Sequence, residues 1–188
     1  GVYPFLDDND TIEEWIYTIT GQHRGICPQG WHVPSTDEFH QLTTYLYNND
    51  EYHCDNDCYA IIGNVVNCIA KALAHTVGWN LYNYTPGTLE WMAGACSVGY
   101  DVSSNNASGF SALPVGYAGG GHGEPIDDYH WFFYPYVYYS GERAYFWSST
   151  STYSSGQHRF QMYYNQSAVK HEDDIVGIQG YSVRCLRD

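Results

Sequence analysis

The sequence predicts an α+β fold, with two helices in the first half of the chain and a mainly antiparallel sheet with long loops in the second half. The first observation is a capping-box spacing at residues 35–38, followed by an apolar helical stripe. The second is the change after Trp79, where Pro, Gly, Asn and Ser divide the chain into short segments. The third is a clear alternation of apolar and more polar side chains over residues 158–165. Helices followed by a run of strands are typical of this class.

The first predicted helix covers residues 36–47. Ser35 stands three residues before Glu38, so each side chain can bond the backbone N–H of the other at the helix start. Phe39, Leu42 and Leu46 then follow at helical intervals. We expect this apolar stripe to face the core.

The second predicted helix covers residues 65–76. Gly78 follows it, and a glycine just beyond the last turn is typical of a helix end. The apolar stripe of this helix is formed by Val65, Ile69, Ala72, Leu73 and Val77.

Two later segments alternate with the period of two that is typical of half-buried strands. In residues 158–165, Phe160, Met162 and Tyr164 fall on one face and the more polar side chains on the other. Residues 181–186 alternate in the same way. We expect two strands, each with its polar face outward.

Tyrosine is unusually frequent, at 20 of the 188 residues. Its ring is rigid and apolar and its hydroxyl can hydrogen-bond, so Tyr-rich surfaces often bind ligands. Tyrosines that line sheet faces would give the same composition. In residues 130–147, ten of the 18 side chains are Phe, Trp or Tyr, so an extended chain must turn some of them outward.

Charge excludes several partners. The chain has 7 Lys and Arg against 21 Asp and Glu, a formal net charge of −14. This charge repels the phosphates of nucleic acids and anionic lipid surfaces. We therefore expect no nucleic acid partner, and we expect no membrane span because no apolar run approaches about 18 residues. A single domain is the simplest interpretation, because no segment reads as a linker.

Six cysteines indicate an oxidising compartment, because their spacings match neither a convincing metal site nor a redox motif. Many pairings of six cysteines are possible, and spacing selects none of them. We predict a secreted or cell-surface protein on this basis.

Five motifs in order resemble the Fibrobacter succinogenes major paralogous domain family. They are CPQGWHVPS at 27–35, IAKALA at 69–74, NASGFSALP at 106–114, YFWSST at 145–150 and GYSVRC at 180–185. The resemblance divides the chain into an N-terminal segment, residues 1–26, which could be a strand or an assembly arm, and the family's domain over residues 27–188.

This resemblance implies a C-type-lectin-like fold, similar also to that of formylglycine-generating enzymes, in an exported bacterial protein. It further implies a disulfide between Cys27 and Cys185. For the other four cysteines our expectation is Cys54 with Cys96 and Cys58 with Cys68. Some family members resemble variable proteins diversified by retroelements, and that likeness implies a binding surface near the C-terminus.

The predicted ligand or interface surface combines the aromatic run with the polar side of the later strand and the segment that follows it. An ordinary polar strand face would show the same alternation. The residues are Tyr134, Tyr136, Tyr138, Tyr139, Gln157, Arg159, Gln161, Tyr163, Asn165, His171, Asp173 and Asp174.

We predict no enzymatic activity, no metal and no cofactor. No nucleophile elbow, HExxH motif or phosphate-binding loop is present. The calcium-dependent sugar motif of lectins is absent too, because Pro125 is followed by Ile126 and Trp147 by Ser148. The expected function is a binding module for a protein or glycan. The alternative is a subunit of an extracellular filament or surface layer, in which residues 1–18 add a strand to another copy.

Overall fold

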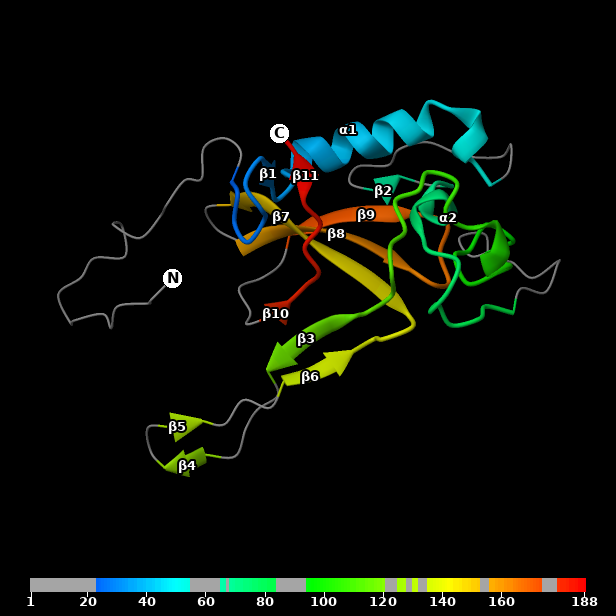
Figure 1. The fold of residues 1–188 in the computed structure, drawn as a ribbon. Coiled ribbons are helices and arrows are strands. Elements are labelled where there is room, and N and C mark those ends of the chain that lie inside the picture. Colours follow the sequence, from blue (N-terminus) through cyan, green and yellow to red (C-terminus); the bar gives the residue numbers. More distant parts are fainter. Residues whose placement is uncertain are drawn as a thin grey trace.

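The computed structural model describes the chain over residues 23–54, 65–66, 68–83, 94–120, 125–127, 130–131, 135–152, 156–173 and 179–188. Within these residues the fold is α+β with few helices and mostly antiparallel strands, as predicted. A four-stranded sheet forms the centre, α1 lies along one side of it, and a smaller sheet extends from its lower end in Figure 1. In the described part of the chain, no helix combines the length and the apolar character needed to cross a bilayer.

The central sheet is antiparallel, with strand order β2-β9-β8-β7. Because β8 is an inner strand, its register pairs Gln161 with Tyr145 on one side and Lys170 on the other, and all three side chains share a face. The predicted strand over 158–165 is confirmed as β8, shifted two residues toward the N-terminus. The strands are Val65–Val66 (β2), Arg143–Thr152 (β7), Gly156–Tyr163 (β8) and Val169–Asp173 (β9).

Helix α1 spans Thr36–Tyr47, as predicted, and covers one face of the central sheet. The Ser35 hydroxyl accepts from the Glu38 N–H at 3.2 Å, and the Glu38 carboxylate accepts from the Ser35 N–H at 2.8 Å. The buried ring of Phe39 stacks on that of Phe160 with centroids 4.8 Å apart. The hydrophobic core therefore lies between α1 and this face of the sheet.

The second predicted helix, over residues 65–76, is largely wrong. Among the described residues of this range only Ala70–Leu73 (α2) is helical, whereas Val65–Val66 pairs with β9. Cys68, between them, has a φ of 67°, a left-handed conformation that a right-handed helix does not contain. The long-range pairing overrides the helical spacing, and β-branched valines suit a strand.

A three-stranded antiparallel sheet, order β10-β3-β6, supplies tyrosines to the other face of the central sheet. The ring of Tyr117 lies 5.7 Å from that of Tyr145, and Tyr181 stacks on Tyr145 at 5.1 Å. This face, which the polar alternation predicts to be exposed, is therefore partly covered. The strands are Tyr117–Gly120 (β3), Pro135–Tyr138 (β6) and Gln179–Gly180 (β10).

The predicted continuous strand over 181–186 is wrong. Ser182 forms an isolated bridge with Phe146, and the chain becomes a strand again only at Leu186–Arg187 (β11), which pairs with Trp31–His32 (β1). The segment crosses from one sheet to another, so one strand cannot span it. The remaining elements are the hairpin strands Pro125–Asp127 (β4) and His130–Trp131 (β5) and the 3-10 helices Asp50–Tyr52 and Val102–Ser104.

Disulfides connect distant parts of the chain. Cys27 is bonded to Cys185, 158 residues away, and Cys54 to Cys96. Closing the longer loop contributes about 5 kcal/mol of stability in the chain-entropy description. Cys68 is disulfide-bonded as well, and its expected partner Cys58 lies outside the described residues.

Candidate ligand-binding site

Gln161 does not lie on an exposed face, which corrects the prediction for this residue. Its side chain is 0% exposed. It occupies the middle of the inner strand β8, with the larger side chains of Tyr145 and Lys170 paired beside it. Neither its amide nitrogen nor its amide oxygen has a hydrogen-bond partner among the described residues. Alternation correctly separates the two sides of β8, but it does not reveal that both sides are covered.

His171 is also wrongly predicted to be on the ligand surface. It is 3% exposed and pairs in register with Phe160, so it points into the core beneath α1. Its ring lies 4.1 Å from that of His40, and its Nε2 lies 3.5 Å from the Thr43 hydroxyl. Burial, and then the proximity of His40, lower the pKa of His171 to about 3, so the ring is neutral at physiological pH.

The tyrosine cluster consists of Tyr117, Tyr136, Tyr138 and Tyr139, on β3, β6 and the residue that follows β6. Tyr136 is 54% exposed, and Tyr138 and Tyr139 are also exposed. Tyr117 and Tyr138 stack at 5.2 Å, and Tyr136 contacts Tyr138 edge to face at 6.3 Å. These rings support one another and present a connected aromatic surface to solvent.

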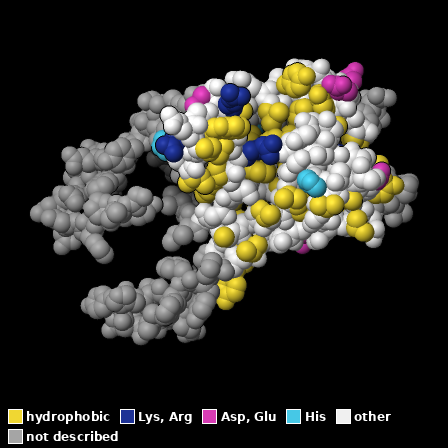
Figure 2. Space-filling model, in the orientation of Figure 1, with side chains coloured by type: hydrophobic (Ala, Val, Ile, Leu, Met, Phe, Trp, Pro, Cys, Tyr) yellow, Lys and Arg dark blue, Asp and Glu magenta, His cyan; other side chains and the backbone are white. Residues whose placement is uncertain are grey.

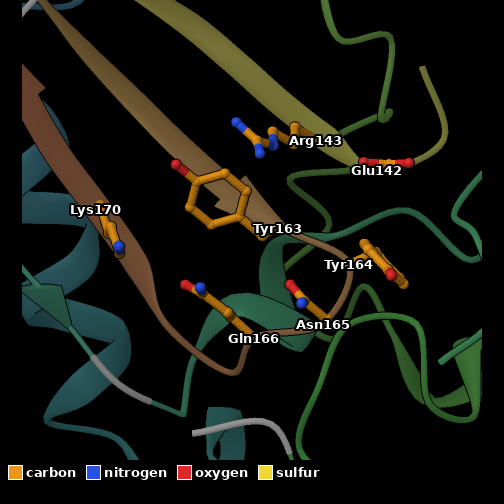
Figure 3. Close-up of a pocket in the computed structure, with 7 residues that line it drawn as sticks. All are labelled: Glu142, Arg143, Tyr163, Tyr164, Asn165, Gln166 and Lys170. Atoms are coloured by element: carbon orange, nitrogen blue, oxygen red, sulfur yellow. The ribbon is translucent and has the colours of Figure 1, made fainter. Parts of the chain in front are cut away.

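A cavity of about 400 Å³ opens beside this cluster, where β7 begins and β8 ends. Figure 3 shows the Arg143, Tyr163, Gln166 and Lys170 side chains around one space, with Tyr164 turned away from it. The start of β7, the end of β8 and the start of β9 meet here because these three consecutive strands pair. The lining residues are Glu142, Arg143, Tyr163, Tyr164, Asn165, Gln166 and Lys170.

Arg143 joins the cavity to the tyrosine cluster. Its guanidinium carbon lies 3.7 Å from the ring centroid of Tyr139 and 4.7 Å from that of Tyr163. Its Nη1 donates a hydrogen bond to the Tyr145 hydroxyl at 3.0 Å. The ammonium of Lys170 lies 5.3 Å from the same Tyr163 ring. These cation–π contacts orient both cations.

Tyr163 keeps its proton at physiological pH. Burial, and then the nearby Glu172 carboxylate, raise the pKa of its hydroxyl to about 12. The phenol can therefore serve as a neutral hydrogen-bond donor at the edge of the cavity.

The basic residues are unevenly distributed. Three of the 7 Lys and Arg in the chain, Arg143, Arg159 and Lys170, lie on this face of the central sheet. Arg159 forms an ion pair with Glu172 at 3.2 Å and donates a hydrogen bond to the Tyr181 hydroxyl at 2.8 Å. Lys and Arg are sparse on the face shown in Figure 2, yet two of the seven, Arg143 and Lys170, line one cavity in a chain with a net charge of −14.

The structure brings Tyr139 and Tyr163 together through Arg143 and places Asn165 in the cavity wall, whereas Arg159 lies farther along β8. Sequence reasoning misses Arg143, Glu142 and Gln166, and it assigns Tyr164, which also lines the cavity, to the apolar face of the strand. Only the β7–β8 register, which pairs Arg143 with Tyr163, could have identified Arg143.

Several predicted residues cannot be placed in the site. Gln157 and Asp173 lie in β8 and β9, but their side chains are not among the described ones. Tyr134 and Asp174 lie outside the described residues, as does most of the predicted N-terminal arm, residues 1–26.

One family model matches almost the whole sequence. The family described as the Fibrobacter succinogenes major domain aligns with residues 3–187. No curated protein and no solved structure matches the chain.

Proposed function

The chain belongs to the Fibrobacter succinogenes major domain family, and we propose that it is a non-enzymatic binding module, secreted or displayed on the cell surface. The observation that carries the proposal is the link through Arg143 between the exposed tyrosine cluster and the 400 Å³ cavity. A ligand would fill the cavity with one group and lie across the aromatic rings with its neighbours.

The physical support comes from exposure and rigidity. Tyr136, Val137, Tyr138 and Tyr139 are four consecutive exposed apolar or aromatic residues. An apolar surface of this kind is commonly an interaction site in soluble proteins. Ring stacking restrains these side chains, so less conformational entropy is lost when a ligand binds.

An extracellular location is supported by the disulfides, which persist in oxidising compartments. The finer fold assignment, C-type-lectin-like, is part of the proposal. It is supported by the pairing of β1 with β11 and by the Cys27–Cys185 bond, which bring the two ends of the domain together.

A second candidate function is a structural subunit of a filament or surface layer. Strand β6 favours it, because β6 lies at the edge of its sheet and carries exposed Tyr136, Val137 and Tyr138. An edge strand of this kind can pair with a strand from another copy.

The test combines binding arrays with light scattering. Purified protein is applied to arrays of glycans and extracellular proteins, beside a Tyr136→Ala/Tyr138→Ala variant and a Tyr45→Ala control. Tyr45 is 56% exposed and lies on α1, so it matches Tyr136 in exposure but not in place. We expect a dispersed monomer whose array binding falls at least tenfold in the double variant and not in the control. Absence of binding together with a mass that grows with concentration would favour the filament.

A further inference from the structure

We propose that the cavity recognises the carboxylate of an acidic sugar, such as a uronic acid within a glycan chain. This inference rests on the proposed function and names the ligand class of the same site. It is carried by the imbalance between hydrogen-bond donors and acceptors in the cavity wall, and by the aromatic platform beside it.

The cavity wall is rich in donors. The guanidinium of Arg143 has five N–H groups and the ammonium of Lys170 has three. Asn165 and Gln166 each add amide N–H groups together with one carbonyl oxygen, and the Tyr163 phenol keeps its proton. Glu142 supplies the one carboxylate of the wall. A ligand that offers acceptors and negative charge therefore complements this wall best.

The donors of Arg143 remain accessible despite its stacking. Rings that contact a guanidinium through its flat faces leave the N–H groups at its edge free to bond. Of these, only Nη1 has a hydrogen bond within the described residues, to the Tyr145 hydroxyl. The planar edge of a guanidinium matches the two oxygens of a carboxylate.

Neither cation of the cavity is strongly neutralised. Arg143 forms no ion pair with an acidic residue in the described part of the chain. Lys170 approaches Glu172 only at 3.9 Å, while Glu172 makes a closer pair with Arg159 at 3.2 Å. Both charges are therefore available to an anionic group, although the chain as a whole is acidic.

The neighbouring surface favours a sugar over a free anion. A cavity of about 400 Å³ is at the lower end of the sizes typical of small-ligand sites and can hold one ring with its carboxylate. The exposed rings of Tyr136, Tyr138 and Tyr139 then offer flat apolar faces to the C–H surfaces of the following sugars.

The test uses oligosaccharides of galacturonic, glucuronic and sialic acid, each beside its methyl ester, which keeps the ring and removes the charge. Sulfated and phosphorylated oligosaccharides and the protein array described above are tested beside them. Affinity is measured by titration calorimetry for the natural sequence and for Arg143→Gln, Lys170→Gln and Arg187→Gln. Arg187 is exposed in β11, away from the cavity, and is the matched charge control. Thermal unfolding of each variant checks that it folds. If Arg143→Gln does not fold, Lys170→Gln still tests the proposal.

We expect at least one acid to bind tenfold or more tightly than its ester, with affinity falling as salt rises. Each cavity variant is expected to lower that affinity about tenfold and the Arg187 control less than twofold. Equal binding of acid and ester, or tighter binding of a sulfated or phosphorylated sugar, would overturn the carboxylate assignment. Neither result would contradict the proposed function as a binding module. Binding to proteins but to no sugar would likewise overturn the assignment without contradicting that function. If no glycan or protein binds at all, the proposed function itself fails.

Discussion

The imidazole of His32 and the carboxylate of Asp188 are joined by a hydrogen bond of 2.7 Å between Nδ1 and Oδ1. The other ring nitrogen of His32 lies 2.9 Å from the carboxylate of Glu38, the residue of α1 that completes the capping box with Ser35. One buried ring thus connects β1, the start of α1 and the end of β11. Its hydrogen bond to Asp188, opposed by burial and aided by Glu38, raises the pKa of His32 above its ordinary value.

This contact predicts a loss of stability at alkaline pH. A group whose pKa is higher in the folded state stabilises the protein fully below its unfolded pKa of about 6.5, and this contribution disappears as pH rises through the folded value. We expect the Tm to fall by a few degrees between pH 6.5 and pH 8.5, and His32→Gln to remove most of that slope. Exposed His23 is the control, because His23→Gln should keep the slope. Calorimetry across this range checks the prediction, which a flat natural profile would contradict.

The buried ring of His171 predicts a loss of stability at acid pH. Its pKa is lowered to about 3 in the folded protein, so between pH 6.5 and pH 3 the unfolded chain binds a proton that the folded one does not. Stability should fall by up to about 1.4 kcal/mol per pH unit over this range from His171 alone. Urea unfolding at pH 6.5 and pH 4.5 measures the loss, and His171→Leu should reduce it. An equally steep loss in that variant would assign the acid sensitivity to other groups.

Replacement of Gln161 by methionine should stabilise the protein. Methionine is flexible and close in volume to glutamine, and the substitution removes a buried amide that has no hydrogen-bond partner in the described part of the chain. An unsatisfied buried polar group costs about 1–3 kcal/mol, so we expect a gain of about 1 kcal/mol or more in the free energy of unfolding. Gln41→Met, at an exposed position of α1, serves as the control and should change stability by less than about 0.5 kcal/mol. A destabilised Gln161→Met would mean that the amide makes a contact that the structure does not contain.

Lys71 should stabilise the segment that follows Cys96. Its buried ammonium bonds the backbone carbonyls of Ser97 at 3.4 Å and Asp101 at 3.1 Å, and also that of Tyr100. Lys71→Met would leave three carbonyls without this donor, and we expect it to lower the free energy of unfolding by about 3 kcal/mol. Chemical denaturation measures this, and Lys170→Met, on the sheet surface, should cost less than about 1 kcal/mol. Similar small effects of both substitutions would show that water replaces the ammonium easily.

Local rules predicted the elements whose hydrogen bonds are local. The helix over 36–47 is correct because Ser35 and Glu38 satisfy the first free N–H groups from within four residues. The helical spacing over 65–76 failed because Val65 and Val66 obtain their partners from β9, about a hundred residues later in the chain. No pattern within a short window contains that competing strand.

The sequence by itself determined the fold class, the first helix, the alternation of β8 and, through family motifs, the Cys27–Cys185 bond. Only the tertiary structure decided which sides of the strands meet solvent. Alternation states that Phe160 and Gln161 face opposite ways, but Gln161 is buried too, between the paired residues Tyr145 and Lys170. The cavity likewise depends on the antiparallel register that sets Arg143 beside Tyr163, since strand register is a relation between distant segments.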